Sequence, residues 1–95
     1  MGIDTSKPIK FSAHSLEKMA DRGVSKNEVE SAIRSGNPEP TRKGRFLFRK
    51  NFTYNQLWRG SHYSIKQVAA VVAEEAEYLV VVTVYAFYFK ISAKE

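Results

Sequence analysis

Two helix-capping signals near the start of the chain constrain its fold more than any other feature. Ser12 is the first, because a serine before an apolar-periodic segment is a favourable N-cap. We expect the helix to occupy residues 13–22 and to end at Gly23, since glycine favours the left-handed conformation that closes many helices. Its apolar side chains are spaced for one helical face: Ala13, Leu16, Met19 and Ala20.

The second signal is Ser25-Lys-Asn-Glu28, a capping box in which the serine and the glutamate each accept from the other's backbone amide. It predicts a helix over residues 26–35 that ends at Gly36. The connection between the two helices is short, so residues 12–36 are expected to form a helical hairpin. The face that the second helix should bury consists of Val29, Ala32 and Ile33.

The rest of the chain has the periodicity of strands. Residues 37–40 contain two prolines and end the helical pattern. Residues 43–50 alternate basic and apolar side chains, and residues 65–73 and 78–89 read as two further strands. The acidic segment 74–77 predicts a turn that joins these two strands in a hairpin. The last strand is apolar on both faces, which indicates a central position in the sheet.

These patterns predict one α+β domain over residues 1–95, with two N-terminal helices packed on a three- or four-stranded antiparallel sheet over residues 43–90. Residues 1–10 are expected to be a loose lead-in or a short edge strand. Residues 51–61 fit either a long hairpin loop or a short strand.

Composition limits the classes of function. The chain has no cysteine, which excludes disulfide and thiolate chemistry and fits a reducing compartment, so a cytoplasmic location is expected. Its two histidines, His14 and His62, are not at metal-ligand spacing, so neither a metal nor another cofactor is expected. The longest apolar stretch, residues 79–89, is too short for a transmembrane helix, so no membrane association is expected.

The net charge is +5 and the isoelectric point is near 9.6. This basic balance favours an acidic partner, such as nucleic acid or an acidic protein segment. An equally good interpretation is that the charge only keeps a small domain soluble.

Candidate catalytic residues lie on the first helix and the last strand. His14, Lys18 and Arg22 fall on one stripe of the helix, opposite Leu16 and Met19, and bring a titratable ring and two cations to one edge. Such a stripe suits a phosphate, although a solvated helix face has the same pattern. Thr83 and Tyr85 share one face of the last strand and could orient a phosphate, although both residue types are also simply good strand formers.

The densest positive cluster comprises Lys43, Arg45 and Arg49, with Arg42 and Lys50 beside it, and Trp58 and other aromatic residues are interleaved with it or follow it. Cations that hold a backbone and rings that stack on unpaired bases are typical of RNA-binding surfaces. The alternative is that the aromatic side chains belong to the core, which we expect for Phe46 and Phe48.

The chain resembles a bacterial domain family of unknown function through Ser12-Ala-His14, Arg22-Gly-Val-Ser25 and Thr83-Val-Tyr85, over about residues 10–88. Members of that family open with a Ser-x-His helix, pass through an Arg-Gly-(Ile/Val)-Ser turn and end in a Thr-Val-Tyr strand. The family is grouped with RelE/ParE-like and BrnT-like toxins, so the resemblance implies a RelE-like toxin fold, which includes metal-independent ribonucleases. Here residues 51–61 look longer than the family's usual hairpin, and Trp58 has no counterpart.

The resemblance implies a shared site at the family's helix histidine, its arginine and its strand hydroxyls, which fall on His14, Arg22, Thr83 and Tyr85. In the first hypothesis the chain is a toxin-like endoribonuclease of the mRNA interferase type, in a toxin–antitoxin system. His14 would act as general base or acid, Arg22 with Arg49 or Arg45 would hold the scissile phosphate, and Thr83 and Tyr85 would orient it. Its RNA-binding residues would be Lys18, Lys43, Arg45, Arg49 and Trp58, and its substrate messenger or ribosome-bound RNA.

Two further hypotheses stay open. The chain would be a module of the same fold that binds RNA or an acidic antitoxin protein without cleavage, or a small structural protein that forms a homodimer through its aromatic segment 85–89.

Overall fold

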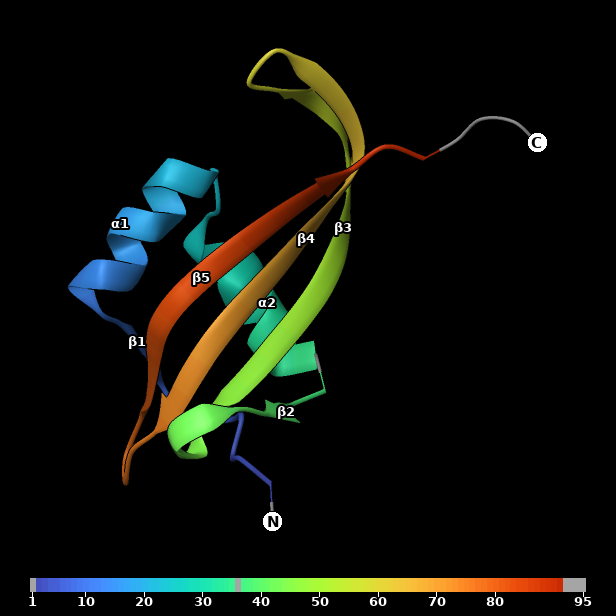
Figure 1. Cartoon of the computed structure of the whole chain (residues 1–95). Coiled ribbons are helices and arrows are strands. Elements are labelled where there is room, and N and C mark those ends of the chain that lie inside the picture. Colours follow the sequence, from blue (N-terminus) through green and yellow to red (C-terminus); the bar gives the residue numbers. More distant parts are fainter. Residues whose placement is uncertain (1, 36, 92–95) are drawn as a thin grey trace.

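Two helices and five strands make up the fold of residues 2–35 and 37–91, which the computed structural model describes (Figure 1). In chain order the elements are β1 (Ile9–Phe11), α1 (Ala13–Arg22), α2 (Lys26–Ser35), β2 (Glu39–Pro40), the short 3-10 helix η1 (Arg42–Gly44), β3 (Phe46–Trp58), β4 (Ser61–Glu74) and β5 (Leu79–Phe89). The two helices at their predicted positions and the α+β class are therefore confirmed. Neither described helix is long and apolar enough to cross a membrane.

Both predicted helix starts are confirmed by their hydrogen bonds. The hydroxyl of Ser12 accepts from the backbone amide of Ser15 at 3.0 Å. The Ser25 amide donates to the Glu28 carboxylate at 2.9 Å, and the Glu28 amide donates to the Ser25 hydroxyl at 3.1 Å. Gly23 closes α1 in the left-handed conformation, with φ of 70°. The predicted end of the second helix at Gly36 lies outside the described residues.

The sheet has five strands in the order β1-β5-β4-β3-β2, and its β1–β5 pair is parallel. The prediction of a three- or four-stranded, wholly antiparallel sheet is therefore wrong. It missed β2 and left β1 open between two interpretations, because strands of two and three residues are too short to show alternation. Of the two predictions for residues 1–10, the short edge strand is confirmed at Ile9–Phe11.

Residues 51–61 form neither a long loop nor a short strand. β3 continues to Trp58, turns at Arg59 and Gly60, and pairs with β4 down to Ser61. The alternation of side chains is broken because the β3–β4 register shifts between Thr53 and Gln56. The result is a long hairpin whose tip curls away from the rest of the sheet (Figure 1).

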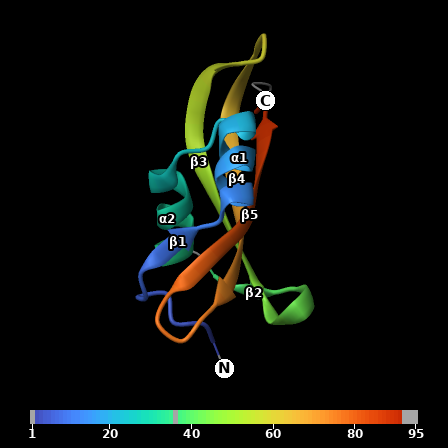
Figure 2. The same ribbon diagram turned by 90° about the vertical axis from the view of Figure 1, so that its left-hand side faces the viewer.

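The helices occupy different positions on the sheet. α2 covers one face and buries Val29, Ala32 and Ile33 against β3 and β4, as predicted. α1 instead lies along the edge of β5 (Figures 1 and 2). The opposite face of the sheet, toward the viewer in Figure 1, carries neither helix. The sheet contributes to the core through Phe48, Val68, Ala70, Val72, Leu79, Val81 and Val84.

The edge position of α1 explains why its predicted apolar face is wrong. Met19 is buried, but the other fully enclosed side chain is Ser15, and Leu16 is 41% exposed. A helix that packs on a sheet face usually has three or four apolar residues in every two turns. A helix beside a strand edge buries only a narrow strip of its surface, so it needs fewer. β5 is likewise central only over Leu79–Val81, where β1 pairs with it.

Candidate nucleic-acid interface

The uncovered face of the sheet presents side chains in rows that cross three strands. Arg49 on β3 pairs with Ala69 on β4, which pairs with Tyr85 on β5. Side chains at paired positions point to the same face, so these three form one row. Thr83 belongs to the adjacent row, opposite Val71. Ala69 between them is only 2% exposed, because the larger side chains around it cover it.

Arg22 reaches this face from the C-terminal end of α1. Its guanidinium donates to the backbone carbonyl of Val84 at 2.7 Å, and its Cζ lies 5.1 Å from the ring centroid of Tyr85. The contact with Val84 fixes the guanidinium at the edge of β5, and its other N–H donors form no hydrogen bond with another described residue. We call Arg22, Arg49, Thr83 and Tyr85 the open-face cluster.

The placement of Arg22 corrects one prediction. Its stripe on α1 was expected to lie away from the apolar side of the helix, yet Arg22 is half-buried against β5. Its side chain satisfies a carbonyl that β5 would otherwise present at a free edge. Arg22 therefore combines a structural contact with a cation on the open face.

Arg49 closes the other side of the cluster. Its Nε lies 3.0 Å from the Glu39 carboxylate, and both side chains are 47% exposed. An ion pair this exposed contributes about 0–1 kcal/mol, so a phosphate can replace the carboxylate at little cost. Arg49 and Tyr85 stand two strand spacings apart, about 10 Å between Cα atoms.

His14 and Lys18 continue the stripe that ends at Arg22. The N-terminal end of α1 is joined to β5 by Ser12, whose amide donates to the Val81 carbonyl at 3.2 Å. His14 is exposed and forms no hydrogen bond or ion pair with another described residue, whereas Lys18 is half-buried. The helical rise puts His14 about 12 Å along the axis from Arg22. The structure thus brings Arg22, Thr83 and Tyr85 together, with His14 further along the same edge.

The predicted RNA-binding residues do not form one patch. Lys43 and Arg45 lie in and just after η1, where Lys43 has φ of 61°, so the prediction that they belong to a basic strand is wrong. Trp58 lies at the opposite end of β3, roughly 40 Å along the strand. Of this group, only Arg49 belongs to the open-face cluster.

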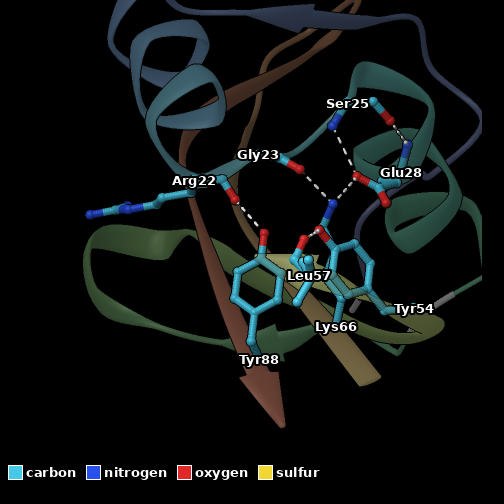
Figure 3. A network of polar contacts seen from close by, with 8 residues as sticks. All are labelled: Arg22, Gly23, Ser25, Glu28, Tyr54, Leu57, Lys66 and Tyr88. Atoms are coloured by element: carbon cyan, nitrogen blue, oxygen red, sulfur yellow. Dashed lines mark hydrogen bonds and ion pairs between the residues drawn. The ribbon is translucent and has the colours of Figure 1, made fainter. Parts of the chain in front are cut away.

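A polar network holds the turn between the helices in place (Figure 3). The Tyr88 hydroxyl donates to the Arg22 carbonyl at 2.6 Å. The Lys66 ammonium donates to the Gly23 carbonyl and pairs with the Glu28 carboxylate at 2.8 Å. The Arg22-Gly-Val-Ser turn therefore has a structural role whatever else it does, and the Arg22 side chain extends away from the network (Figure 3).

Sequence reasoning missed Lys66 and Tyr88. The side chain of Lys66 is only 5% exposed and occupies the inward-facing position before Val68 and Ala70 on β4. A lysine in phase with buried apolar residues was the available signal, because a buried cation requires a partner. Tyr88 gave no signal, since tyrosine is common in strands.

Gly23 is required by the approach of the hairpin tip. A Cβ atom there would lie 2.6 Å from Cζ3 of Trp58 and 3.2 Å from the Tyr88 hydroxyl. Trp58 stacks on Tyr88, with ring centroids 5.0 Å apart and planes 15° from parallel. Burial, followed by the nearby Tyr54 and Glu28, raises the pKa of Tyr88 to about 12, with Arg59 opposing the shift. The phenol therefore stays protonated and remains a donor.

Within residues 2–35 and 37–91, no three histidine, aspartate or glutamate side chains gather closely enough to hold a metal ion.

The fold and the open-face cluster define a class: a small α+β domain with one helix on a sheet face, one along a sheet edge, and a cation-lined open face. The chain belongs to the family described as Domain of unknown function (DUF4258), whose model matches residues 11–86. The match spans both helices and all four residues of the open-face cluster. Neither the curated proteins nor the solved structures contain a significant match to the chain.

Proposed function

We propose that the protein is a metal-independent endoribonuclease of the toxin type, which holds single-stranded RNA on the open face of its sheet beside α1. The observation that carries this proposal is the guanidinium of Arg22, fixed on the Val84 carbonyl and placed over Tyr85, in line with Arg49. Two cations that border the same face suit a phosphate, and an exposed phenol suits an unpaired base. The resemblance to RelE/ParE-like and BrnT-like toxins supports the same proposal.

The proposed chemistry uses the substrate's own 2′-hydroxyl as nucleophile. His14 takes the proton from that hydroxyl, and its oxygen forms a bond to phosphorus. The bond from phosphorus to the 5′-oxygen breaks, and the leaving oxygen takes a proton from water. Arg22 and Arg49 stabilise the charge that develops on the phosphate, and Thr83 and Tyr85 orient it. The products are a 2′,3′-cyclic phosphate and a 5′-hydroxyl.

The test is incubation of the purified full chain with RNA in EDTA, followed by analysis of the product ends. We expect His14→Ala to lower the cleavage rate about 10²- to 10⁴-fold, the usual contribution of a general base or acid. His62→Ala is the matched control, because His62 is the other histidine and lies exposed on β4 near the hairpin tip. Cleavage that is undiminished in His14→Ala would remove His14 from the mechanism.

A second candidate is a module of the same fold that binds RNA or an acidic antitoxin protein without cleaving. The observation that favours it is the exposed ring of His14, which no described residue orients. Binding would then be tight and salt-sensitive, with no turnover. Harmless accumulation of the lone chain in a bacterial host would favour this candidate, whereas a toxin should arrest growth unless its partner is present.

A further inference from the structure

A hollow of about 180 Å³ lies between the C-terminal end of α1 and the tip of the β3–β4 hairpin. It is lined by Asp21, Arg22, Trp58, Arg59, Ala86 and Tyr88. Ala86 follows Tyr85 in β5, and successive strand residues point to opposite faces. The hollow is therefore just across β5 from the open-face cluster, and Arg22 borders both.

The chemistry of the lining favours an anion with a flat group attached. The lining residues include two arginines, Arg22 and Arg59, and one aspartate, Asp21, so together they carry a net positive charge. Arg59 donates to the backbone carbonyl of Asp21, and its Cζ lies 4.9 Å from the ring centroid of Trp58. The indole N–H of Trp58 has no acceptor among the described residues and remains available to a ligand.

The rings and the guanidinium plane provide a stacking surface. Tyr88 supports Trp58 from below in a near-parallel stack, and its hydroxyl is already used on the Arg22 carbonyl. Unpaired bases stack on aromatic rings and on arginine guanidinium planes, and such stacking tolerates any base. An acidic peptide would use the cations but leave these flat surfaces without a matching group.

We propose that this hollow binds one nucleotide of single-stranded RNA, with its phosphate between Arg22 and Arg59 and its base against the Trp58–Arg59 surface. This inference rests on the proposed function and extends the RNA path from the open face, over the edge of β5 at Arg22, to the hairpin tip. The volume of about 180 Å³ fits one nucleotide and not several, because it is smaller than the roughly 300–1,000 Å³ of pockets for drug-sized ligands.

The test uses Trp58, the one tryptophan of the chain, as an internal probe. The full-length protein is titrated in EDTA with uridine 5′-monophosphate and with a short oligouridylate carrying 2′-O-methyl groups, which cannot be cleaved through a 2′-hydroxyl. We expect both to change the Trp58 emission at saturation. Arg59→Ala should lower the affinity for the oligonucleotide about tenfold or more, as expected for the loss of a charge-assisted contact.

Two further variants make the test specific. Arg42→Ala removes one exposed cation from η1, at the far end of β3, and should leave the titration unchanged. Ala86→Leu fills the hollow without removing a charge and should weaken binding as well, which keeps the test valid if Arg59→Ala disturbs the hairpin tip.

The outcomes separate this inference from the proposed function. If the wild-type chain cleaves RNA but neither probe alters Trp58 emission, the hollow is not a nucleotide site and the proposed function stands. If the chain cleaves nothing but binds both probes in an Arg59-dependent manner, the hollow is a nucleotide site and the endoribonuclease proposal fails. A response to poly-glutamate and to neither nucleotide probe would overturn the inference in favour of an acidic peptide.

Discussion

At the scale of single residues, Tyr88 decides how the hairpin tip meets the helices. Its ring stacks under Trp58 and contacts Tyr54 edge-on, with centroids 5.4 Å apart, while its hydroxyl donates to the Arg22 carbonyl. Only the protonated phenol can donate that hydrogen bond. The pKa of Tyr88, raised by burial to about 12, is therefore linked to the stability of the fold.

The raised pKa of Tyr88 predicts a loss of stability at alkaline pH. An unfolded tyrosine loses its proton near pH 10, whereas folded Tyr88 keeps its proton until about pH 12. In that window the folded state binds more protons, so the free energy of unfolding falls as pH rises from 10 to 12. Below pH 10 the stabilisation by Tyr88 is fully present and does not change with pH. We expect the urea midpoint, followed by Trp58 fluorescence, to fall more between pH 9 and pH 11 in the wild type than in Tyr88→Phe. Equal falls in both proteins would contradict the linkage.

Gly23 shows how far a single residue can be understood from the sequence. Its role as the left-handed end of the first helix was predicted from the residue type alone, and is confirmed. The close approach of Trp58 was not predictable, because it depends on a hairpin tip 35 residues later that curls back over the turn. Local conformation is encoded locally, whereas a tertiary contact of this kind is not.

At the scale of elements, the same distinction separates correct from incorrect predictions. The starts of both helices and the end of α1 were predicted because capping is a local hydrogen-bonding problem. β1 was open between two interpretations because its pairing with β5 spans about 70 residues of chain. The apolar face of α1 was wrong because periodicity indicates a helix but not whether it packs on a sheet face or along an edge.

The Lys66–Glu28 pair gives the prediction at this scale, because it joins β4 to the start of α2. Lys66→Met removes charge-assisted hydrogen bonds to the Gly23 carbonyl and to Glu28. We expect the free energy of unfolding, measured by urea denaturation, to fall by about 2 kcal/mol. Arg49→Met is the control, since it breaks an exposed pair on the same sheet and should cost about 0–1 kcal/mol.

The double variant Lys66→Met/Glu28→Gln sharpens that experiment. The glutamine can still accept from the Ser25 amide. Because the carboxylate of Glu28 has been replaced, no half-buried charge is left without its cation. Part of the lost stability should therefore return. A single Lys66→Met variant no less stable than Arg49→Met would show that the buried pair does not hold the two elements together.

At the scale of the whole molecule, five basic residues that were predicted or are proposed to contact RNA lie in three separate places. Lys43 and Arg45 lie at the η1 end, Arg22 and Arg49 border the open face, and Arg59 lies at the hairpin tip. The sequence predicted a charged, RNA-binding character but grouped Trp58 with the η1 cations, because neighbours along a chain look like neighbours in space. An extended β3 separates them. That Arg22, Thr83 and Tyr85 share an edge was anticipated through the family resemblance, and their role in catalysis stays a prediction.

This distribution makes a prediction about the salt dependence of RNA binding. Each phosphate contact with single-stranded nucleic acid contributes about −0.7 to the slope of log K against log salt concentration. If RNA runs from the open face over the β5 edge to the hairpin tip, Arg49→Ala and Arg59→Ala should each reduce the slope by about 0.7. Arg42→Ala, on η1, should leave the slope unchanged, and so should His14→Ala, because the proposed mechanism gives His14 no contact with a phosphate.

The measurement is fluorescence anisotropy of a labelled oligouridylate with 2′-O-methyl groups, titrated with the full-length chain at several potassium chloride concentrations. If RNA follows the path from the open face over the edge of β5 to the hairpin tip, the affinity must depend on Arg49 and Arg59 more than on Arg42, although all three carry the same charge. An equal reduction of the slope by all three variants would mean that RNA is attracted by the net charge of +5 and not by a defined path. The open-face cluster and the hollow would then both lose their assignment as RNA contacts.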